Sequence, residues 1–281
     1  SSLVKSASLP EDILRREDPR PLSHKGTVLQ PSPPVIFLHP SFVWLVIQIA
    51  FFENKCMNCG LCNHVKSEIT AKYCPTQAIM VFGQEYEVDE LVYELMKEKE
   101  FYKNSGGGVT LSGGECLAQS DFATALSREL FQNGISVNID TCGYVNNEVL
   151  KIIIPYTDKF LYDIKAIDNN VHKKCTTQDN YIILENLKFL CENNCKIEVR
   201  YPLVKGYNDK ESDNIGLFLK DLKGIIKVKV LQYHHFSGSR YKALNMVNTL
   251  PVAETLYQDV QLAVNILKSY GLNAINGIDE S

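Results

Sequence analysis

The stretch that decides the fold is Ser105–Gln119, with the sequence SGGGVTLSGGECLAQ. Its five glycines fall within nine residues and flank the β-forming triplet Val109–Leu111. Glycine at this density indicates a backbone that takes positive φ angles or lets a ligand approach where a Cβ atom would block it. A helix is expected directly afterwards, because apolar residues recur at four-residue spacing before Gly134: Phe122, Leu126 and Leu130.

This strand–turn–helix unit indicates a ligand-binding position. The turn Ser112–Glu115 places free backbone amides and one carboxylate at the carboxyl end of a parallel strand, where α/β proteins bind small ligands. The turn is no phosphate-binding loop, because no Gly-Lys-Ser/Thr follows, and it does not match GxGxxG. Glu115 can accept hydrogen bonds from an amine of the ligand. For a lone Gly-Gly-Glu, a structural turn without a ligand is the alternative.

Strand and helix patterns alternate from here to the end of the chain. Apolar residues at alternate positions predict strands around 135–139, 160–162, 197–199 and 226–230. Amphipathic helices are expected over 88–96, 181–190 and 256–267. The repeat predicts a parallel (β/α) barrel, complete or partial.

Charged residues follow the predicted strands at or just past their carboxyl ends. They are Glu115, Asp140, Asp163, Lys165, Arg200 and His234. Binding sites of barrels are built at that rim, so six such residues from successive strands predict one pocket. Asp140 and Asp163 are expected to face each other, and two close carboxylates repel unless a bound cation, Lys165 or a shared proton compensates. A metal ion and a plain Asp–Lys ion pair are equal alternatives.

A group of cysteines precedes the barrel pattern. Cys56, Cys59 and Cys62 have C-x2-C-x2-C spacing, and Cys74 follows after eleven intervening residues, directly before a proline. This arrangement is typical of iron–sulfur ligation, and four cysteines suffice for one [4Fe–4S] cluster. Zinc is the alternative, although its structural sites usually pair two C-x2-C hooks. Residues 53–85 are therefore expected to form a ferredoxin-like insert with one cluster.

The first 52 residues differ from the rest. Residues 1–34 hold six of the eleven prolines and three of the six arginines without periodicity, which predicts a poorly ordered or foreign segment. Residues 35–52 are expected to contain the first strand, Val35–Leu38, and a hydrophobic connection. This apolar run is shorter than the about 20 residues of a membrane span and is interrupted at His39–Ser41, so no membrane association is expected.

Length, net charge and cysteine spacing limit the classes of protein to which the chain can belong. A length of 281 residues suffices for one barrel-sized domain with a small insert. The net charge of −4 and the lack of any basic run argue against a nucleic-acid partner. The leading cysteines have metal-ligand spacing rather than a disulfide framework, which favours a cytoplasmic location.

Together these motifs resemble the glycyl-radical-enzyme activating enzymes, radical S-adenosylmethionine (SAM) proteins related to pyruvate formate-lyase activating enzyme. The resemblance runs in order from about Phe51 to Gly271. Besides SGGGVTLSGGE, it rests on DTCGY (Asp140–Tyr144), LYDIKAID (Leu161–Asp168), HKKCT with Asn180 downstream, VRYPLVKGYND (Val199–Asp209) and LQYHHFSGSRYKAL (Leu231–Leu244). It implies an α/β fold: a partial (β/α)6 TIM-like barrel of the radical SAM type over 86–281, with a small ferredoxin-like iron–sulfur insert.

The resemblance also implies roles for single residues. Gly113, Gly114 and Glu115 match the motif that holds the methionine amine of SAM. Lys165 matches a residue near the SAM carboxylate, Arg200 one near the ribose and His234 one beside the nucleoside. Asp140, Thr141 and Asp163 match a monovalent-cation site.

The implied activity is formation of a glycyl radical on a partner enzyme by way of a 5′-deoxyadenosyl radical. The implied cofactors are SAM, a [4Fe–4S] cluster and a monovalent cation. The implied partners are a glycyl-radical enzyme as protein substrate and a flavodoxin- or ferredoxin-type electron donor, and a monomer is expected.

One motif of that family is missing from the sequence. The family's reactive cluster is bound by C-x3-C-x2-C after the first strand, but the corresponding positions here fall near Ser41, Leu45 and Gln48. Leucine cannot ligate iron, and serine and glutamine are poor replacements for a thiolate. Three interpretations stay open. The first is a working activating enzyme, whose reactive cluster is bound by Cys56, Cys59 and Cys62 or whose true N-terminus differs from this one. The second is a degenerate iron–sulfur homologue that acts in binding or electron transfer, and the third is an activating enzyme whose first 50 residues are out of frame or misassembled.

Overall fold

The computed structural model describes residues 42–43, 48–62, 67–82, 86–113, 115–233 and 254–280. The N-terminal segment 1–34, the expected strand 35–38, Gly114 and His234 lie outside these residues. The chain divides into two compact units, a larger one built mainly from 88–234 and 253–281 and a smaller one from 23–87 and 235–252.

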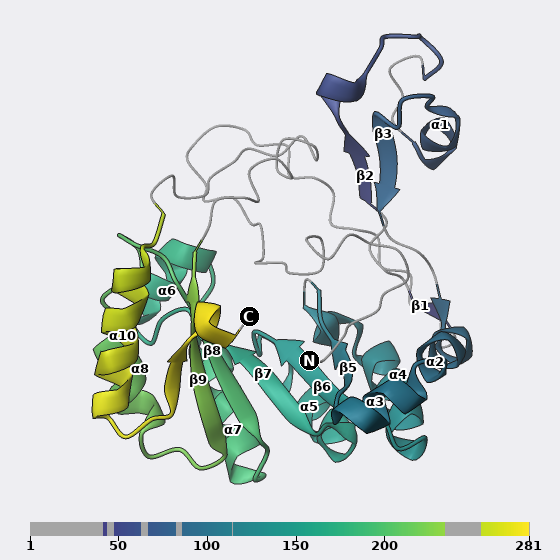
Figure 1. The fold of residues 1–281 in the computed structure, drawn as a ribbon. Coiled ribbons are helices and arrows are strands. Elements are labelled where there is room, and N and C mark those ends of the chain that lie inside the picture. The colour runs from purple at the N-terminus through teal and green to yellow at the C-terminus, as the bar shows by residue number, and fades with distance from the viewer. Residues whose placement is uncertain are drawn as a thin grey trace. The chain divides into compact units, whose positions relative to one another are not determined.

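The larger unit is built on a six-stranded parallel sheet (Figure 1). Neighbouring strands follow one another in chain order, and every neighbouring pair is parallel. The strands are β5 (Gly108–Leu111), β6 (Ser136–Thr141), β7 (Lys159–Asp163), β8 (Ile197–Leu203), β9 (Ile225–Gln232) and β10 (Ala274–Asn276). A parallel sheet whose neighbouring strands follow chain order is the arrangement of a (β/α) barrel. The expected α/β fold of the partial TIM-like type is therefore confirmed.

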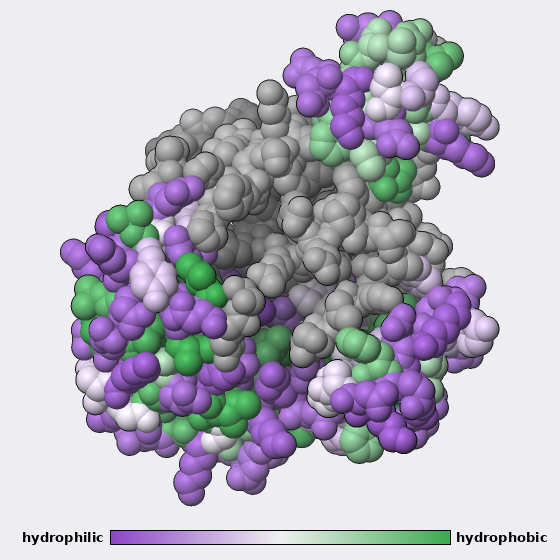
Figure 2. Space-filling view, in the orientation of Figure 1, coloured by the Kyte–Doolittle hydropathy of each residue, from purple (hydrophilic) through white to green (hydrophobic). Residues whose placement is uncertain are grey.

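Helices connect the strands, and helices that are close in chain order contact one another. α4 contacts β6 and α5, α5 contacts α7, and α8 contacts α10. The α-helices of this unit are α2 (Val88–Met96), α3 (Lys99–Ser105), α4 (Ser120–Gln132), α5 (Asn147–Ile153), α6 (Asn169–Thr176), α7 (Tyr181–Glu192), α8 (Ser212–Leu219) and α10 (Tyr257–Ser269). Short 3-10 turns are η3 (Cys116–Gln119), η4 (Ile154–Tyr156) and η6 (Gly277–Glu280). Hydrophilic residues predominate on the outer surface seen in Figure 2, as expected of amphipathic helices.

The core lies between the sheet and these helices. The alternating apolar residues of the central strands are at most 1% exposed: Val137, Ile139, Phe160, Tyr162, Ile197, Val199, Val228 and Val230. Leu126 and Leu130 of α4 and Val260, Val264 and Leu267 of α10 complete the same cluster. The periodicity that predicted these strands and helices is therefore the pattern that packs the core.

A close contact joins the loop after β6 to the middle of the core. The hydroxyl of the fully buried Tyr162 donates to the carbonyl of Ile183 at 2.6 Å. Gly143 has a φ of +72°, and a Cβ atom at this position would lie 1.8 Å from that hydroxyl. The loop therefore needs glycine at residue 143 for both its backbone angle and its space.

The smaller unit contains two short antiparallel pairs. β1 (Phe42–Val43) pairs with β4 (Tyr86–Glu87), and β2 (Gln48–Phe51) pairs with β3 (Ile79–Phe82). Between β2 and β3 lie η2 (Glu53–Lys55), the four cysteines and α1 (Glu68–Tyr73), which begins with a capping box between Ser67 and Thr70. Gln48 thus stands in a strand of this small unit.

Two expectations about the strands need correction. Arg200 was expected at or past the carboxyl end of its strand, but β8 continues to Leu203 because Tyr201–Leu203 stay in register with Val230–Gln232 of β9. Arg200 is therefore an interior strand residue, opposite Asp163 on β7. The short strand β10 was not expected. Among the described helices, none has the length and apolar character needed to cross a membrane.

Candidate functional site

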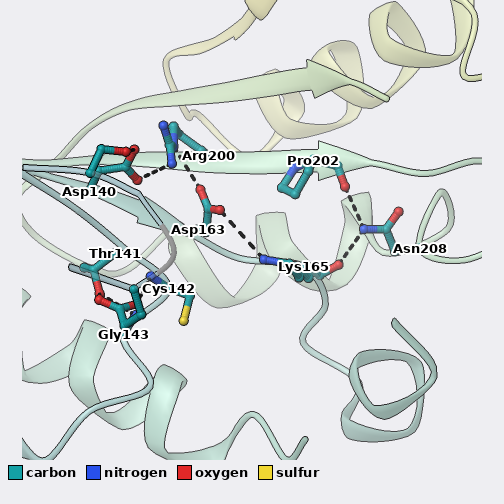
Figure 3. A network of polar contacts seen from close by, with 11 residues as sticks. Asp140, Thr141, Cys142, Gly143, Asp163, Lys165, Arg200, Pro202 and Asn208 are labelled. Carbon is teal, nitrogen blue, oxygen red and sulfur yellow. Dashed lines mark hydrogen bonds and ion pairs between the residues drawn. The ribbon is translucent and has the colours of Figure 1, made fainter. Parts of the chain in front are cut away.

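Two carboxylates at the carboxyl end of the sheet share one guanidinium group. Asp140 lies near the end of β6 and Asp163 ends β7, and Arg200 on β8 reaches both (Figure 3). Arg200 Nε donates to Asp163 Oδ1 at 2.9 Å, and an Arg200 terminal nitrogen donates to Asp140 Oδ1. The expected pairing of Asp140 with Asp163 thus occurs through Arg200, whose role as their common partner the sequence did not predict.

Lys165 extends this network beyond the end of β7. Its ammonium lies 3.7 Å from Asp163 Oδ2, and its side chain is 18% exposed. Ser112, in the turn after β5, donates to Asp140 Oδ2 at 2.6 Å. Two carboxylates and two cations therefore alternate across three neighbouring strands, and each charge has an opposite charge beside it.

Burial shapes the proton affinities in this network. Burial raises the pKa of Asp140 above its ordinary value, which the nearby Arg200 opposes and the nearby Asp163 reinforces. Burial lowers the pKa of Arg200, but the charges of Asp163 and Asp140 outweigh it and leave the pKa raised. Arg200 therefore stays charged and compensates the charges of the two partly buried carboxylates.

Glu115 joins the turns after β5 and β6. Its Oε1 accepts from Leu117 N at 3.1 Å and from the Thr141 hydroxyl at 2.7 Å, and its Oε2 accepts from Cys142 N at 2.9 Å. Burial together with the nearby charge of Glu115 raises the pKa of the Cys142 thiol to about 12. A carboxylate has about four acceptor positions, and donors among the described residues fill three of them, so one position fits the ammonium of a ligand.

The turn beside Glu115 leaves room for a ligand. Gly113 has a φ of +98°, and a Cβ atom at this position would meet no atom of the described residues within 4 Å. With the ammonium of Lys165 and the carboxylate of Glu115 on neighbouring loops, the residues present fit an amino acid-like ligand that carries one amine and one carboxylate.

The cation site expected at Asp140, Thr141 and Asp163 remains a prediction. In the structure, Arg200 and Lys165 supply positive charge to the two carboxylates. The Thr141 hydroxyl donates to Glu115 and accepts from Gly143 N at 2.9 Å. Compensation by protein cations is one of the alternatives that the sequence left open.

The four cysteines of the expected iron–sulfur insert lie in the smaller unit. Cys56 precedes a loop in which Cys59 and Cys62 follow, and Cys74 is the residue after α1. Over the ranges that the structure describes, no three His, Cys, Asp or Glu side chains converge in a group that can hold a metal ion. The cluster assignment therefore rests on the spacing of the cysteines and stays a prediction.

Buried side chains that sequence reasoning missed hold the loops at this rim. Asn186 donates to the carbonyls of Gly143 and Val145, both at 2.8 Å. Asn180 donates to those of Ala166 and Ile167, at 3.0 and 2.8 Å. Asn208 donates to those of Lys165 and Pro202, at 2.7 and 2.8 Å. The motifs LYDIKAID and VRYPLVKGYND contain this last contact, but their sequence shows no signal for it.

Comparison with known proteins gives consistent matches. The sequence profile described as the Radical SAM superfamily matches residues 72–219. The choline trimethylamine-lyase activating enzyme of Oleidesulfovibrio alaskensis is 35% identical over 226 residues, which cover 70% of this chain and 73% of that protein. The trans-4-hydroxy-L-proline dehydratase activating enzyme of Clostridioides difficile is 40% identical over 227 residues, which cover 69% and 72%.

A solved structure agrees with these matches. A domain of pyruvate-formate lyase-activating enzyme from Bacteroides vulgatus superposes with a TM-score of 0.52 at 27% identity, covering 61% of this chain and 99% of that domain. The relatives are activating enzymes, and they support that interpretation over a homologue restricted to binding or electron transfer.

Proposed function

Because this chain belongs to the glycyl-radical-enzyme activating enzymes of the radical SAM superfamily, we propose that it binds SAM at the carboxyl end of its parallel sheet. Membership implies SAM and a [4Fe–4S] cluster as cofactors and a glycyl-radical enzyme as protein substrate. SAM bound to a cluster with one open iron would supply a 5′-deoxyadenosyl radical, which would remove a hydrogen atom from a glycine of the substrate.

The arrangement of charged side chains at the carboxyl end of the sheet supports this proposal. The SAM amino acid moiety has one ammonium and one carboxylate, and the site offers Glu115 to the first and Lys165 to the second. The Lys165 ammonium lies 3.7 Å from Asp163 Oδ2, and it is the positive charge that we assign to the ligand carboxylate. Gly113 and Gly114 match the family motif for the methionine amine, and glycine at these two positions would let the backbone approach the ligand.

The remaining assignments follow the family. Arg200 and His234 are assigned to the nucleoside end of SAM, and Asp140, Thr141 and Asp163 to a monovalent cation. Arg200 already contacts the carboxylates of Asp140 and Asp163. We therefore assign it a second role, which is to hold these two side chains in place at the bottom of the site. The electron donor is a flavodoxin or a ferredoxin, and the protein acts as a cytoplasmic monomer without a nucleic-acid or membrane partner.

Substitution of Lys165 tests the SAM site. Lys165→Met should weaken SAM binding by about tenfold to a hundredfold. This loss corresponds to the free energy of one charge-assisted hydrogen bond, about 1.5–3 kcal/mol. The measurement is isothermal calorimetry of the full chain under anaerobic conditions. Lys159→Met is the matched control, because Lys159 lies at the opposite end of the same strand and pairs with Glu198 at 3.5 Å. Equal affinities of the Lys165 variant and the unmodified chain would contradict the proposed site.

The cysteines of the smaller unit are proposed to hold one [4Fe–4S] cluster. Anaerobic reconstitution is expected to give about four irons per chain, because one cluster uses four thiolates. The double variant Cys56→Ser, Cys59→Ser should lose this iron, whereas Cys191→Ser, which changes a buried thiol of α7, should keep it. Iron and zinc are measured by plasma mass spectrometry. One tightly bound zinc in place of iron would refute the cluster, and about eight irons would reveal a second site.

A further inference from the structure

The hydroxyl of Thr141 connects the end of strand β6 to Glu115. Thr141 is the last residue of β6 and is 2% exposed. Its Oγ1 lies 2.9 Å from Gly143 N and 2.7 Å from Glu115 Oε1. A backbone N–H can only donate, so the hydroxyl accepts from Gly143 and its one proton is directed to Glu115. The loop after β6 therefore determines the direction in which this hydroxyl donates (Figure 3).

The loop after β6 is itself held from the core. Asn186 of α7, which is 2% exposed, donates from Nδ2 to the carbonyls of Gly143 and Val145, both at 2.8 Å. Gly143 also lies directly against the hydroxyl of the fully buried Tyr162. The N–H group of Gly143 therefore has little freedom to turn away from the Thr141 hydroxyl.

The Glu115 carboxylate is held at both of its oxygens. Oε1 accepts from the Thr141 hydroxyl and from Leu117 N, and Oε2 accepts from Cys142 N. Among these three donors, the hydroxyl makes the shortest contact and belongs to a side chain, whereas the other two are backbone groups. A substitution at residue 141 can therefore release Glu115 on one side without changing the backbone donors.

We propose that Thr141 is a positioning residue, whose hydroxyl orients the Glu115 carboxylate toward the ammonium of the bound amino acid moiety. This inference rests on the proposed SAM site, and its ligand class is an amino acid attached to a nucleoside. The role differs from that of a cation ligand, because a cation would bind a lone pair of the Thr141 oxygen whereas Glu115 uses its proton. Loss of the hydroxyl should therefore affect recognition of the ligand amine in particular.

The test compares two ligands that differ only in the amine. S-adenosylhomocysteine has the amine and the carboxylate, and its desamino analogue, 4-(5′-adenosylthio)butanoate, has the carboxylate alone. Thr141→Val removes the hydroxyl and keeps the shape of the side chain. In the full chain, anaerobic calorimetry should show about tenfold weaker binding of S-adenosylhomocysteine and less than a twofold change for the analogue. Thr141→Ser, which keeps the hydroxyl, should bind both ligands within about twofold of the unmodified chain.

A buried threonine of the neighbouring strand provides the matched control. Thr110 on β5 is 4% exposed, and its hydroxyl accepts from Asn138 Nδ2 at 3.4 Å. Thr110→Val removes a buried hydroxyl from the same sheet, so it should leave the affinities for both ligands unchanged. Should Thr141→Val fail to fold, Thr141→Ala is measured in the same way.

A double variant separates positioning from other effects of the substitution. If Thr141 acts through Glu115, adding Thr141→Val to Glu115→Gln should cost no further affinity for S-adenosylhomocysteine. Additive losses, or equal losses for the two ligands in Thr141→Val, would overturn the positioning role. If the unmodified chain binds neither ligand, or if Glu115→Gln has no effect, the proposed site itself is refuted. An effect of Glu115→Gln without one of Thr141→Val would refute this inference alone.

Discussion

Arg200→Met is expected to lower the free energy of unfolding by about 3 kcal/mol at neutral pH, because it leaves two partly buried carboxylates without their shared partner. This is the lower end of the range for a broken buried ion pair. The side chains of Asp140 and Asp163 are 16% exposed, and Lys165 stays beside Asp163, so some compensation remains. Denaturant unfolding monitored by circular dichroism measures the loss.

The size of this loss should depend on pH. In the folded protein, burial already raises the pKa of Asp140 against the attraction of Arg200. Without Arg200 that pKa rises further, and a folded-state pKa raised above the unfolded value favours folding at low pH and loses this contribution as pH rises through the folded pKa. The difference between the variant and the unmodified chain should therefore shrink as the pH falls and Asp140 takes up a proton.

An exposed arginine provides the control. Arg128→Met removes a surface contact with Glu129 at 3.9 Å, where both side chains are more than a third exposed. Such contacts contribute about 0–1 kcal/mol, so this variant should be close to the unmodified chain at every pH. A pH-independent loss for Arg200→Met would mean that packing, rather than charge, accounts for the effect.

The second large effect concerns the chemistry of SAM. Reduced with dithionite after reconstitution, the 281-residue chain is expected to release no 5′-deoxyadenosine from SAM. Reductive cleavage needs a cluster with one iron left open, and four thiolates from Cys56, Cys59, Cys62 and Cys74 would close all four irons. The sequence supplies no cysteine before Cys56 for a second, open cluster.

Liquid chromatography of the reaction mixture checks this expectation. The comparison protein is the same chain with an added N-terminal segment that bears C-x3-C-x2-C, which is expected to produce 5′-deoxyadenosine. Turnover by the unmodified chain would contradict the expectation and would assign Cys56, Cys59 and Cys62 to the reactive cluster.

Much of the fold could be predicted because local patterns encode it. Val137 and Ile139, or Val228 and Val230, alternate in the sequence and are buried in the sheet. Gly134 and Gly271, which have φ angles of +73° and +80°, end their helices as expected. The strand β10 was missed because its three residues are too few for a periodic signal.

The sequence predicted which residues form the site better than it predicted which of them contact one another. Asp140, Asp163 and Lys165 follow the apolar runs of two strands, which is visible in the sequence. The pairing of Arg200 with both carboxylates depends on the register between β7 and β8, which packing decides. Asn208 and Glu211 bind backbone groups of residues more than 40 positions away in the chain, and no pattern of side-chain types encodes such partners.

The chain order of the strands also bears on how the protein folds. The paired residues are 21 positions apart where β6 meets β7, at Asn138 and Lys159, and 46 apart where β9 meets β10, at Val228 and Ala274. Doubling the length of a closed loop adds only about 0.6 kcal/mol to its entropic cost, so the successive closures have similar costs. Each strand can therefore dock as it leaves the ribosome, onto a neighbour that is already made. The edge of β9 stays open until residues 274–276 have been made, so β10 is the last described strand to join the sheet, and the edge of β9 is exposed to wrong partners until it does.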